Sequence, residues 1–396
     1  MRHNYQCDKN KLEHIKNILK QGEVNMKDKF KNEKYKVIVW GPGKMGSYAM
    51  HYFLTNDAYE LVGVKGFAEN EINVDAGEFL GLEPCGVIMT NDDDALLALD
   101  ADVVLFTRRE DPNWGTDAEI VKILESGKNV VTTLPYHNLK AWREPEVAAQ
   151  IENACLKNNV TFYAGGVDPD IISDRMLLSM AGACSDIKEA IITEVWDVSN
   201  GAKPNLQFLG YGKTVEEAKK NEKLFASSVN FQKSVVYTAE EDFGVKFDRV
   251  VESHEFHVAE EDITEPWLIE KGTVGRITHH MDCYVNSISE EKPFFRVDLE
   301  WYFGPKMLPA NANPEDDYIL TIEGTPSLQS HVSFKASNYS DEKLISYGNR
   351  KLTPNYIVTI MSVLNSIPTI VEAEAGLHPS IRPQVTWMQD MRDSVK

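Results

Sequence analysis

Short apolar runs alternate with amphipathic segments along the first 166 residues. The runs begin near residues 37, 61, 87, 103, 129 and 160, and they are rich in Val, Ile, Leu and Phe. Short, unbroken apolar runs are typical of parallel strands that are covered on both faces. Segments with helical spacing separate most of them. The pattern therefore predicts βαβ units and an α/β fold with a doubly wound parallel sheet.

The pattern changes after Gly166, where longer strands of mixed polarity begin. An open, mainly antiparallel sheet is predicted by the runs at 187–199, 256–263, 272–288, 293–303 and 318–334. Residues 214–244 predict a pair of helices. The apolar segment 354–377 predicts a long helix that ends near Ile367 and Pro368.

A glycine-rich loop follows the first apolar run. The pattern G-x-G-x-x-G is formed by Gly41, Pro42, Gly43, Lys44, Met45 and Gly46. In this pattern the first glycine permits a tight turn, the second lets a pyrophosphate approach the backbone, and the third allows close packing of helix on strand. The N-terminus of the following helix favours the negative charge of the phosphates. The loop predicts a dinucleotide site of the Rossmann type, and an ordinary glycine-rich bend is the alternative.

These patterns predict two domains in a chain of 396 residues. Residues 1–34 are polar and form an extension. Residues 35–165 form the dinucleotide-binding Rossmann domain, to which the C-terminal segment 354–396 returns. Residues 166–353 form a second, α+β domain that binds substrate, and we expect substrate and cofactor to meet in a crevice between the domains.

Composition narrows the possible partners. The formal net charge of −20 argues against nucleic acid and against anionic membrane surfaces. No apolar run reaches the ~18 residues that cross a bilayer, and the N-terminus lacks the apolar core of a secretory signal. The five scattered cysteines indicate reduced thiols and a cytoplasmic location.

We expect no metal site. The cysteines form no C-x-x-C pair, and His279 and His280 would point to opposite faces of a strand. His254 and His257 could share one face, where filling that face is the favoured interpretation. Asp92 to Asp94 are interpreted as the acidic first turn and N-cap of a helix.

Several stretches together resemble one known family. They are residues 37–46, 75–81, 86–107, 126–133, 163–176, 193–212 and 363–377. In order and spacing they resemble the dihydrodipicolinate-reductase-like branch that contains 2,4-diaminopentanoate dehydrogenase and the native NAD(P)H-dependent amine dehydrogenases. The resemblance implies a homodimer that forms through the second domain, residues 166–353. It also implies reversible reductive amination of a small aliphatic ketone or aldehyde with ammonia.

The resemblance also implies a catalytic glutamate shortly after the fourth strand, and Glu110 is the matching residue. Independent chemistry favours a carboxylate there, because ligands of doubly wound sheets bind beyond the carboxyl ends of the strands. A carboxyl group can move protons during imine formation and stabilise an iminium cation. The alternative is a loop carboxylate that pairs with Arg108 or Arg109.

The second strand indicates the cofactor. NAD-specific folds usually place an acid at its end, whereas here Lys65 and Gly66 occupy that place. A lysine near the ribose would attract a 2′-phosphate, so we expect NADP, with NAD also possible. The alternative is that Lys65 points to solvent. Thr107 and Arg108 are further candidates for cofactor contacts at the end of the strand before Glu110.

Candidates for the substrate pocket follow the fifth and sixth strands. They are Tyr136, His137, Trp142, Tyr163, Val167 and Asp168. Many relatives have "GVNPGF" where this chain has "GVDPDI", so Asp168 and Asp170 replace Asn and Gly. The added charge would disfavour a carboxylate substrate and favour a cationic one. For Asp168 itself we favour the interpretation that it caps the following helix, with Pro169 in the first turn.

Other functions stay open from the sequence. One is 2,4-diaminopentanoate dehydrogenase or another imine-reducing enzyme, although the basic, histidine-rich motif of dihydrodipicolinate reductase is not visible. Another is a dehydrogenase of hydroxy compounds, which needs a Lys, Tyr or His acid instead of Glu110. The third is a sensor that binds NAD(P) without turnover.

Overall fold

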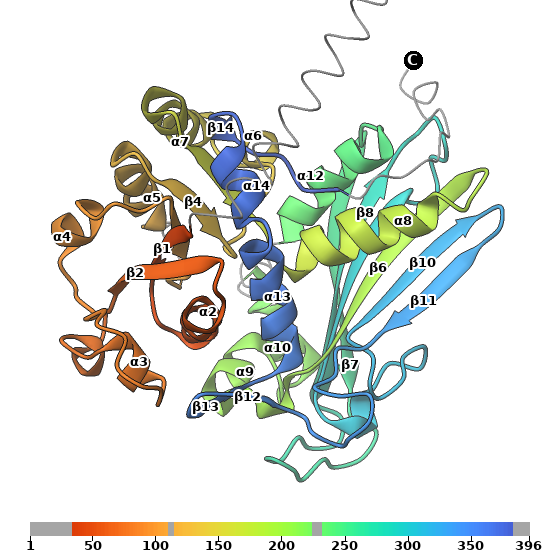
Figure 1. Ribbon diagram of the computed structural model, residues 1–396. Helices are drawn as coiled ribbons and strands as arrows, with labels where there is room; N and C mark the ends of the chain where they lie inside the picture. Colours follow the sequence, from red (N-terminus) through yellow and green to blue (C-terminus); the bar gives the residue numbers. More distant parts are fainter. Residues whose placement is uncertain (1–33, 110–114, 224–231, 383–396) are drawn as a thin grey trace, which may run out of the picture. The chain divides into compact units, whose positions relative to one another are not determined.

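The computed structural model describes residues 34–109, 115–223 and 232–382 of the chain (Figure 1). They belong to two compact units: residues up to Arg108 with Tyr347–Arg350, and Arg109–Ser346 with the residues from Lys351 onward. These units are defined by contacts in space, and the boundary between them divides the parallel sheet. The domain boundary near residue 165 therefore stays a prediction.

The first sheet is parallel and has the strand order β14-β5-β4-β3-β1-β2. Its strands are β1 (Tyr35–Trp40), β2 (Tyr59–Lys65), β3 (Val103–Phe106), β4 (Asn129–Thr132), β5 (Thr161–Ala164) and β14 (Gly376–Leu377). Val37 to Trp40 are completely buried, which explains their unbroken apolar sequence. The predicted doubly wound parallel sheet is thus confirmed.

One predicted strand is wrong. Residues 87–90 form only isolated bridges, in which Ile88 faces Asp75 and Thr90 faces Lys65. The Asp75 carboxylate accepts hydrogen bonds from the backbone N–H groups of Cys85 and Gly86, at 3.0 and 2.7 Å. These bonds hold the chain before this run in a loop, so the run does not extend the sheet.

Short helices connect the parallel strands. They are α2 (Lys44–Thr55), α3 (Ala76–Phe79), α4 (Asp93–Leu97), α5 (Thr116–Glu125), α6 (Leu139–Trp142) and α7 (Pro145–Asn158). The predicted cap of α4 is confirmed, because Asp92 Oδ1 accepts from the backbone N–H of Ala95 at 3.0 Å. A side-chain oxygen in this position satisfies a donor that the helix leaves free.

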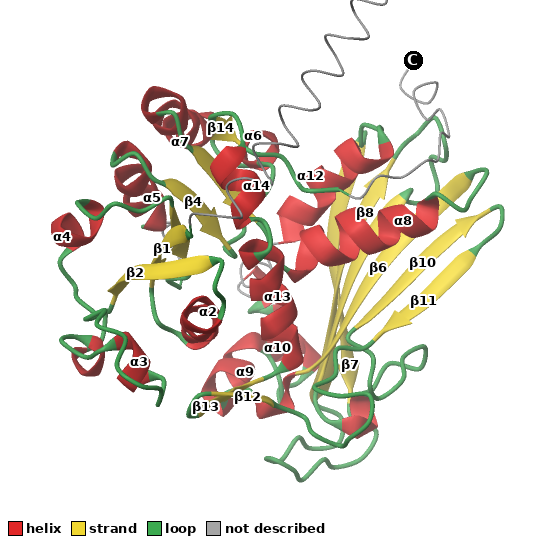
Figure 2. Ribbon diagram, viewed as in Figure 1, coloured by secondary structure: helices red, strands yellow, loops and turns green. Residues whose placement is uncertain are grey.

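The second sheet has the strand order β11-β10-β6-β9-β8-β7 (Figure 2). Its strands are β6 (Ile187–Asp197), β7 (Arg249–Val258), β8 (Val274–Tyr284), β9 (Phe295–Tyr302), β10 (Tyr318–Gly324) and β11 (Leu328–Val332). β6 and β9 are parallel, and the other neighbours are antiparallel. This confirms the prediction of an open, mainly antiparallel sheet. β12 (Ile345–Tyr347) and β13 (Arg350–Leu352) form a separate ribbon.

Helices pack on one face of this sheet (Figure 1). The helical elements of this part are residues Val167–Leu177, α8 (Leu178–Ala181), α9 (Lys203–Leu209), α10 (Val215–Lys219), α12 (Gln232–Phe243), α13 (Pro354–Leu364) and α14 (Ile367–Glu372). The shared core joins Val235 and Phe243 of α12 to Val297 and Leu299 of β9. These apolar side chains bury their surface between helix and sheet, which holds the sheet and its helical layer together.

The C-terminal apolar segment forms two helices instead of one. α13 ends at Leu364, and α14 begins at Ile367 with Pro368 as its second residue. Residues Pro354–Glu372 are long and apolar enough to cross a membrane by length and composition, contrary to the expectation from the sequence. Much of this segment is buried inside the protein, including Ile360 and Ile370. A buried core helix of this length and composition meets the same criterion, so the segment is weak evidence for a membrane span.

Candidate functional site

The glycine loop between β1 and α2 has the geometry of a phosphate cradle. Gly41 has a φ of +111°, which favours glycine, and a Cβ there would lie 3.0 Å from the backbone N of Arg108. A Cβ at Gly46 would lie 1.9 Å from the carbonyl O of Gly41 and 2.8 Å from Thr107 Oγ1. A Cβ at Gly43 would meet nothing within 4 Å. Gly41 and Gly46 thus leave no room for a side chain, whereas the space next to Gly43 is empty. This space lies beside the N-terminus of α2, a 12-residue helix.

Side chains around the loop fix its shape. Thr107 Oγ1 donates to the carbonyl O of Gly41 at 2.8 Å, and Ser47 Oγ donates to that of Pro42 at 2.7 Å. Lys44 and Met45 form the first turn of α2, with no acidic residue in that turn. The positive end of the helix dipole therefore meets no opposing carboxylate in that turn.

Lys65 lies at the end of β2, among aromatic rings and one carboxylate. Its side chain is buried, its Nζ forms an ion pair with Asp93, and Nζ lies 4.7 Å from the centroid of Trp40 and 5.1 Å from that of Phe67. The alternative that Lys65 points to solvent is therefore wrong. The Arg108 guanidinium carbon lies 5.5 Å from the Phe67 ring, which is 46% exposed. Two cations and an accessible ring thus lie at this end of the sheet.

A cavity of about 1410 Å³ lies within the second unit. Its wall includes residues after β4 and β5, the end of β6, the start of β10, the loop after β11 and the first turn of α13. Of the predicted pocket residues, His137, Val167 and Asp168 line this cavity. Arg109 also lines it. Glu110, the next residue in the sequence, lies outside the described residues.

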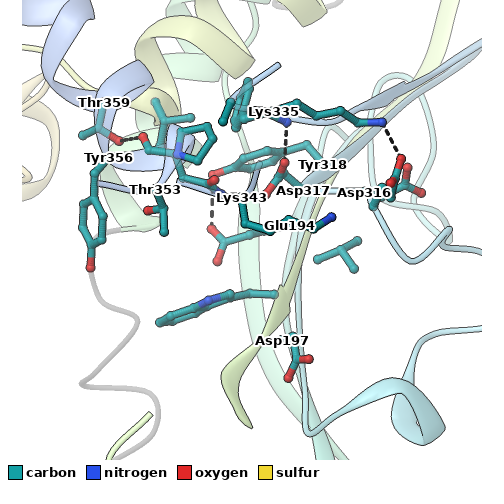
Figure 3. A pocket seen from close by; sticks show the side chains of 18 of the residues that line it. Glu194, Asp197, Asp316, Asp317, Tyr318, Lys335, Lys343, Thr353, Tyr356 and Thr359 are labelled. Carbon is teal, nitrogen blue, oxygen red and sulfur yellow. Dashed lines mark hydrogen bonds and ion pairs between the residues drawn. The ribbon is translucent and has the colours of Figure 1, made fainter. Parts of the chain in front are cut away.

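Carboxylates outnumber cations around this cavity. The acidic lining residues are Asp168, Glu194, Asp197, Glu315, Asp316, Asp317, Asp341 and Glu342, and the basic ones are Arg109, Lys335 and Lys343. Figure 3 shows Glu194 close to Tyr318, with Asp316 and Asp317 nearby. Lys335 forms an ion pair with Glu315. The cavity is therefore suited to cationic ligands.

The interpretation of Asp168 as a helix cap is wrong. Both of its carboxylate oxygens are buried without a hydrogen-bond partner among the described residues, so its side chain does not cap the following helix. The backbone of Asp168 is extended, with φ −135° and ψ 131°, and the side chain lines the cavity instead. Burial, and then the nearby charge of Glu194, raise the pKa of Asp168 well above its usual value.

Glu194 is buried as well, and sequence reasoning missed it as a site residue. Its carboxylate accepts from Trp301 Nε1 at 3.0 Å and from the Tyr318 hydroxyl at 3.4 Å. Burial raises the pKa of Glu194, while these two hydrogen bonds oppose the rise. Its strand also contains Lys188, Glu189 and Asp197, so an acid at position 194 gave no distinct signal in the sequence.

The other predicted pocket residues have partners elsewhere. The Tyr136 hydroxyl donates to Asp117 and lies 2.9 Å from Thr116 Oγ1. Trp142 Nε1 donates to the carbonyl O of His137 at 2.7 Å. These bonds fix the loop after β4, and Tyr136 and Trp142 lie outside the lining of the cavity.

Tyr163 and Asp170 also form an internal network. The Tyr163 hydroxyl donates to Asp170 Oδ2 at 3.2 Å, and Arg175 Nη2 donates to Asp170 Oδ1 at 2.8 Å. Asp170 is completely buried and its charge is paired by Arg175. Of the two added acids, Asp168 and not Asp170 therefore lines the cavity.

Histidines of β7 and β8 form a separate cluster. His254 and His279 face each other across the two strands, with His254 Nε2 2.9 Å from His279 Nδ1. Glu252 completes a set whose donor atoms lie within 4.8 Å, a spacing that a metal ion could use. The hydrogen bond between the two rings also accounts for their arrangement.

His257 and His280 lie on the opposite face of this sheet from His254 and His279. His280 lies 2.7 Å from Asp298, so it faces away from His279, as strand alternation predicts. His257 contacts Thr278 at 3.0 Å, whereas His254 contacts His279. The expectation that His254 and His257 could share a face is therefore wrong, because they are separated by an odd number of residues.

Two parts of the chain match known protein families. Residues 35–133 match the family "Dihydrodipicolinate reductase, N-terminus", and residues 171–396 match the family "2,4-diaminopentanoate dehydrogenase C-terminal domain". The chain is 26% identical over 385 residues to 2,4-diaminopentanoate dehydrogenase of Acetoanaerobium sticklandii, covering 92% of this chain and 98% of that protein. It is 24% identical to an amine dehydrogenase of Streptomyces virginiae, covering 87% and 94%.

The amine dehydrogenase of Mycobacterium smegmatis has a similar fold. Its structure matches with a TM-score of 0.65 at 19% identity, covering 91% of this chain and 99% of that one. The glycine loop and the parallel sheet form a Rossmann fold of the NAD(P)-binding type, and the relatives and family matches show the chain to be an oxidoreductase. Because the second family covers more than half of its length, the chain belongs to the 2,4-diaminopentanoate dehydrogenase C-terminal domain family.

Proposed function

We propose that this chain is an NAD(P)-dependent amine dehydrogenase that interconverts a small aliphatic amine and a ketone or aldehyde with ammonia. The similarity to two proteins named for this chemistry over most of the chain is the observation that carries the proposal. The glycine loop fits a dinucleotide, because only its central glycine leaves open space above the backbone. The acid-rich cavity suits an amine or an iminium cation.

In this proposal the residues of the chain bind, orient and move protons. Gly43 and the first turn of α2 hold the pyrophosphate, and Thr107 fixes the loop through the carbonyl of Gly41. The bound nicotinamide supplies or accepts the hydride. Glu110, assigned from the sequence alone, removes a proton from the nitrogen and protonates the departing hydroxyl.

The test is a comparison of donor classes. Purified protein should reduce NADP⁺ with 2-aminopentane but not with 2-pentanol, and it should oxidise NADPH with 2-pentanone only when ammonia is present. Turnover with the alcohol alone would identify a hydroxy-compound dehydrogenase. Cofactor binding without turnover of any donor would identify a sensor.

Lys65 is expected to determine cofactor preference. Lys65→Asp should lower kcat/KM for NADPH by about 10–100-fold and leave the value for NADH within about threefold, because the variant loses a charge-assisted contact to the 2′-phosphate. Lys36→Ala, at the other end of β1, removes a positive charge as a control. An unchanged ratio between the two cofactors in Lys65→Asp would refute this assignment.

The homodimer and the cytoplasmic location that the sequence implies stay predictions. We also predict that the protein binds neither nucleic acid nor membranes, because its net charge is strongly negative.

A further inference from the structure

Three side chains of metal-ligand type lie on one face of the second sheet, at its edge strand β7. Glu252 and His254 belong to β7, and His279 belongs to β8, directly opposite His254 in the register. His254 Nε2 lies 2.9 Å from His279 Nδ1, and Glu252 Oε1 lies 3.8 Å from the same nitrogen. All three donor atoms lie within 4.8 Å of one another. Ligands that bind one zinc ion at about 2.1 Å are at most about 4.2 Å apart, so a small rotation of Glu252 completes the set.

A hydrogen bond between the two rings does not account for Glu252. The distance of 3.8 Å between its Oε1 and His279 Nδ1 is too long for a hydrogen bond. In the part of the chain that the structure describes, Glu252 also forms no ion pair with a lysine or arginine. Its carboxylate nevertheless lies beside two imidazole nitrogens. A divalent cation explains the position of all three side chains, whereas the bond between the rings explains only two.

A second carboxylate orients one of the rings. Glu222 Oε1 lies 3.0 Å from His254 Nδ1, the ring nitrogen that does not face His279. An ionised carboxylate only accepts hydrogen bonds, so in the neutral ring Nδ1 carries the hydrogen and Nε2 keeps a lone pair. A carboxylate in this place is typical of metal-binding histidines, because it fixes the tautomer and makes the metal-facing nitrogen more basic. Glu222 thus prepares His254 to bind an ion through Nε2.

The imidazoles are enclosed, whereas the carboxylates reach the solvent. The side chains of His254 and His279 are 4% and 1% exposed, and those of Glu222 and Glu252 are 42% and 36% exposed. An ion can therefore enter past the carboxylates and exchange its water for two rings that packing holds in place. Two imidazoles with one carboxylate favour Zn²⁺ over Mg²⁺ and Ca²⁺, which prefer oxygen ligands.

We propose that Glu252, His254 and His279 bind one Zn²⁺ ion, with Glu222 as a positioning residue for His254. The ion joins the edge strand β7 to β8 and stabilises the second sheet. This proposal replaces the expectation from the sequence that the chain has no metal site. The two histidines are 25 residues apart and meet only when the strands pair, so the sequence pattern gave no sign of the site. None of these side chains lines the cavity, so the proposal does not rest on the dehydrogenase activity.

Zinc titration of the metal-free protein tests the site without substrate or cofactor. The full chain, without a histidine tag, is dialysed against EDTA, and the EDTA is then removed. Zn²⁺ is added in competition with a chromophoric chelator. We expect one Zn²⁺ per chain with a Kd of about 1 µM or lower. Free Zn²⁺ at a hundred times this Kd should raise the unfolding midpoint by about 3–8 °C, since a ligand of the folded state stabilises it.

Two substitutions of partly exposed residues locate the ion. Glu222→Gln should raise the Kd for Zn²⁺ by about 10–100-fold, the usual effect of losing a residue that orients a ligand. Glu252→Gln removes a ligand itself, so its effect should exceed about 100-fold. The unfolding midpoint without zinc should stay near the wild-type value in both variants, which distinguishes lost binding from a weakened fold. Glu255→Gln is the matched control, because it removes the same charge from the opposite face of β7, and its Kd should stay within about twofold.

A spectroscopic probe reports the ligands directly. Co²⁺ in place of Zn²⁺ should give visible absorption bands that change in Glu252→Gln and are lost in His279→Asn, which removes a ring ligand. Either variant suffices if the other does not fold. The proposal would be overturned by the absence of zinc binding, or by a Kd that is the same in wild type, Glu252→Gln and Glu222→Gln. Binding of several ions without a rise in the midpoint would also overturn it, because it would show only adventitious surface binding.

Discussion

Gly46→Ala is expected to weaken both the fold of the first unit and its affinity for NADPH. The added methyl group would lie 1.9 Å from the carbonyl O of Gly41 and 2.8 Å from Thr107 Oγ1. One of these atoms belongs to the backbone of the loop, so the loop must move. Overpacking of this kind costs about 1–3 kcal/mol, which corresponds to a fall in the unfolding midpoint of about 3–10 °C. We expect the Kd for NADPH to rise about 10–100-fold, because the displaced loop no longer presents its N–H groups to the pyrophosphate.

Gly43→Ala provides the matched control in the same loop. A Cβ at Gly43 meets no protein atom within 4 Å, so the unfolding midpoint without cofactor should stay within about 1 °C of the wild-type value. The same methyl group would occupy the space through which the pyrophosphate approaches, so the Kd for NADPH should still rise. Thermal unfolding and NADPH fluorescence titration measure the two quantities separately. Wild-type affinity in Gly43→Ala would show that the pyrophosphate does not lie on this loop.

The sequence predicted the parallel sheet well because burial on both faces leaves an unbroken apolar run, as in Val37–Trp40. It failed at residues 87–90, where a similar run is held by hydrogen bonds to the Asp75 carboxylate. Such a constraint comes from a side chain several residues away, and the hydrophobic pattern contains no sign of it. The same holds for the break between α13 and α14, where Pro368 indicated an ending but not a second helix.

The site shows a similar limit. The glycine loop could be found because its motif is local in the sequence, and Asp168 could be found because it follows a predicted strand and departs from the pattern of the resembled family. Glu194 could not be assigned, because its importance arises when β6 and the segment after β5 line one cavity. The interpretation of Asp168 as a cap failed for a related reason. Its backbone is extended, as it is at a helix N-cap, but the carboxylate lines the cavity instead of bonding to the first turn, and residue type alone does not decide between these two places.

Glu110→Gln is expected to lower kcat for amine oxidation by about 10²–10⁴-fold, the usual contribution of a positioned general acid or base. Glutamine keeps the size and polarity of the side chain but cannot take up a proton from the nitrogen. Affinity for NADPH should change less than about twofold, because the glycine loop and not Glu110 is expected to hold the phosphates. Steady-state rates with 2-aminopentane and NADPH fluorescence titration measure these two effects. Asp111→Asn, one residue further along the chain, removes the same charge and should keep kcat within about threefold.

Retention of kcat in Glu110→Gln would move the proton transfer to another carboxylate. Asp168 is then the strongest candidate, because it lines the cavity, accepts no hydrogen bond from the residues that the structure describes and has a raised pKa. A carboxyl group with a raised pKa can both donate and accept a proton near neutral pH, whereas an ordinary one is ionised there. In that case Asp168→Asn would abolish turnover of 2-aminopentane, because asparagine cannot take up or release the proton. If Asp168 takes no part in proton transfer, the same variant should retain this turnover.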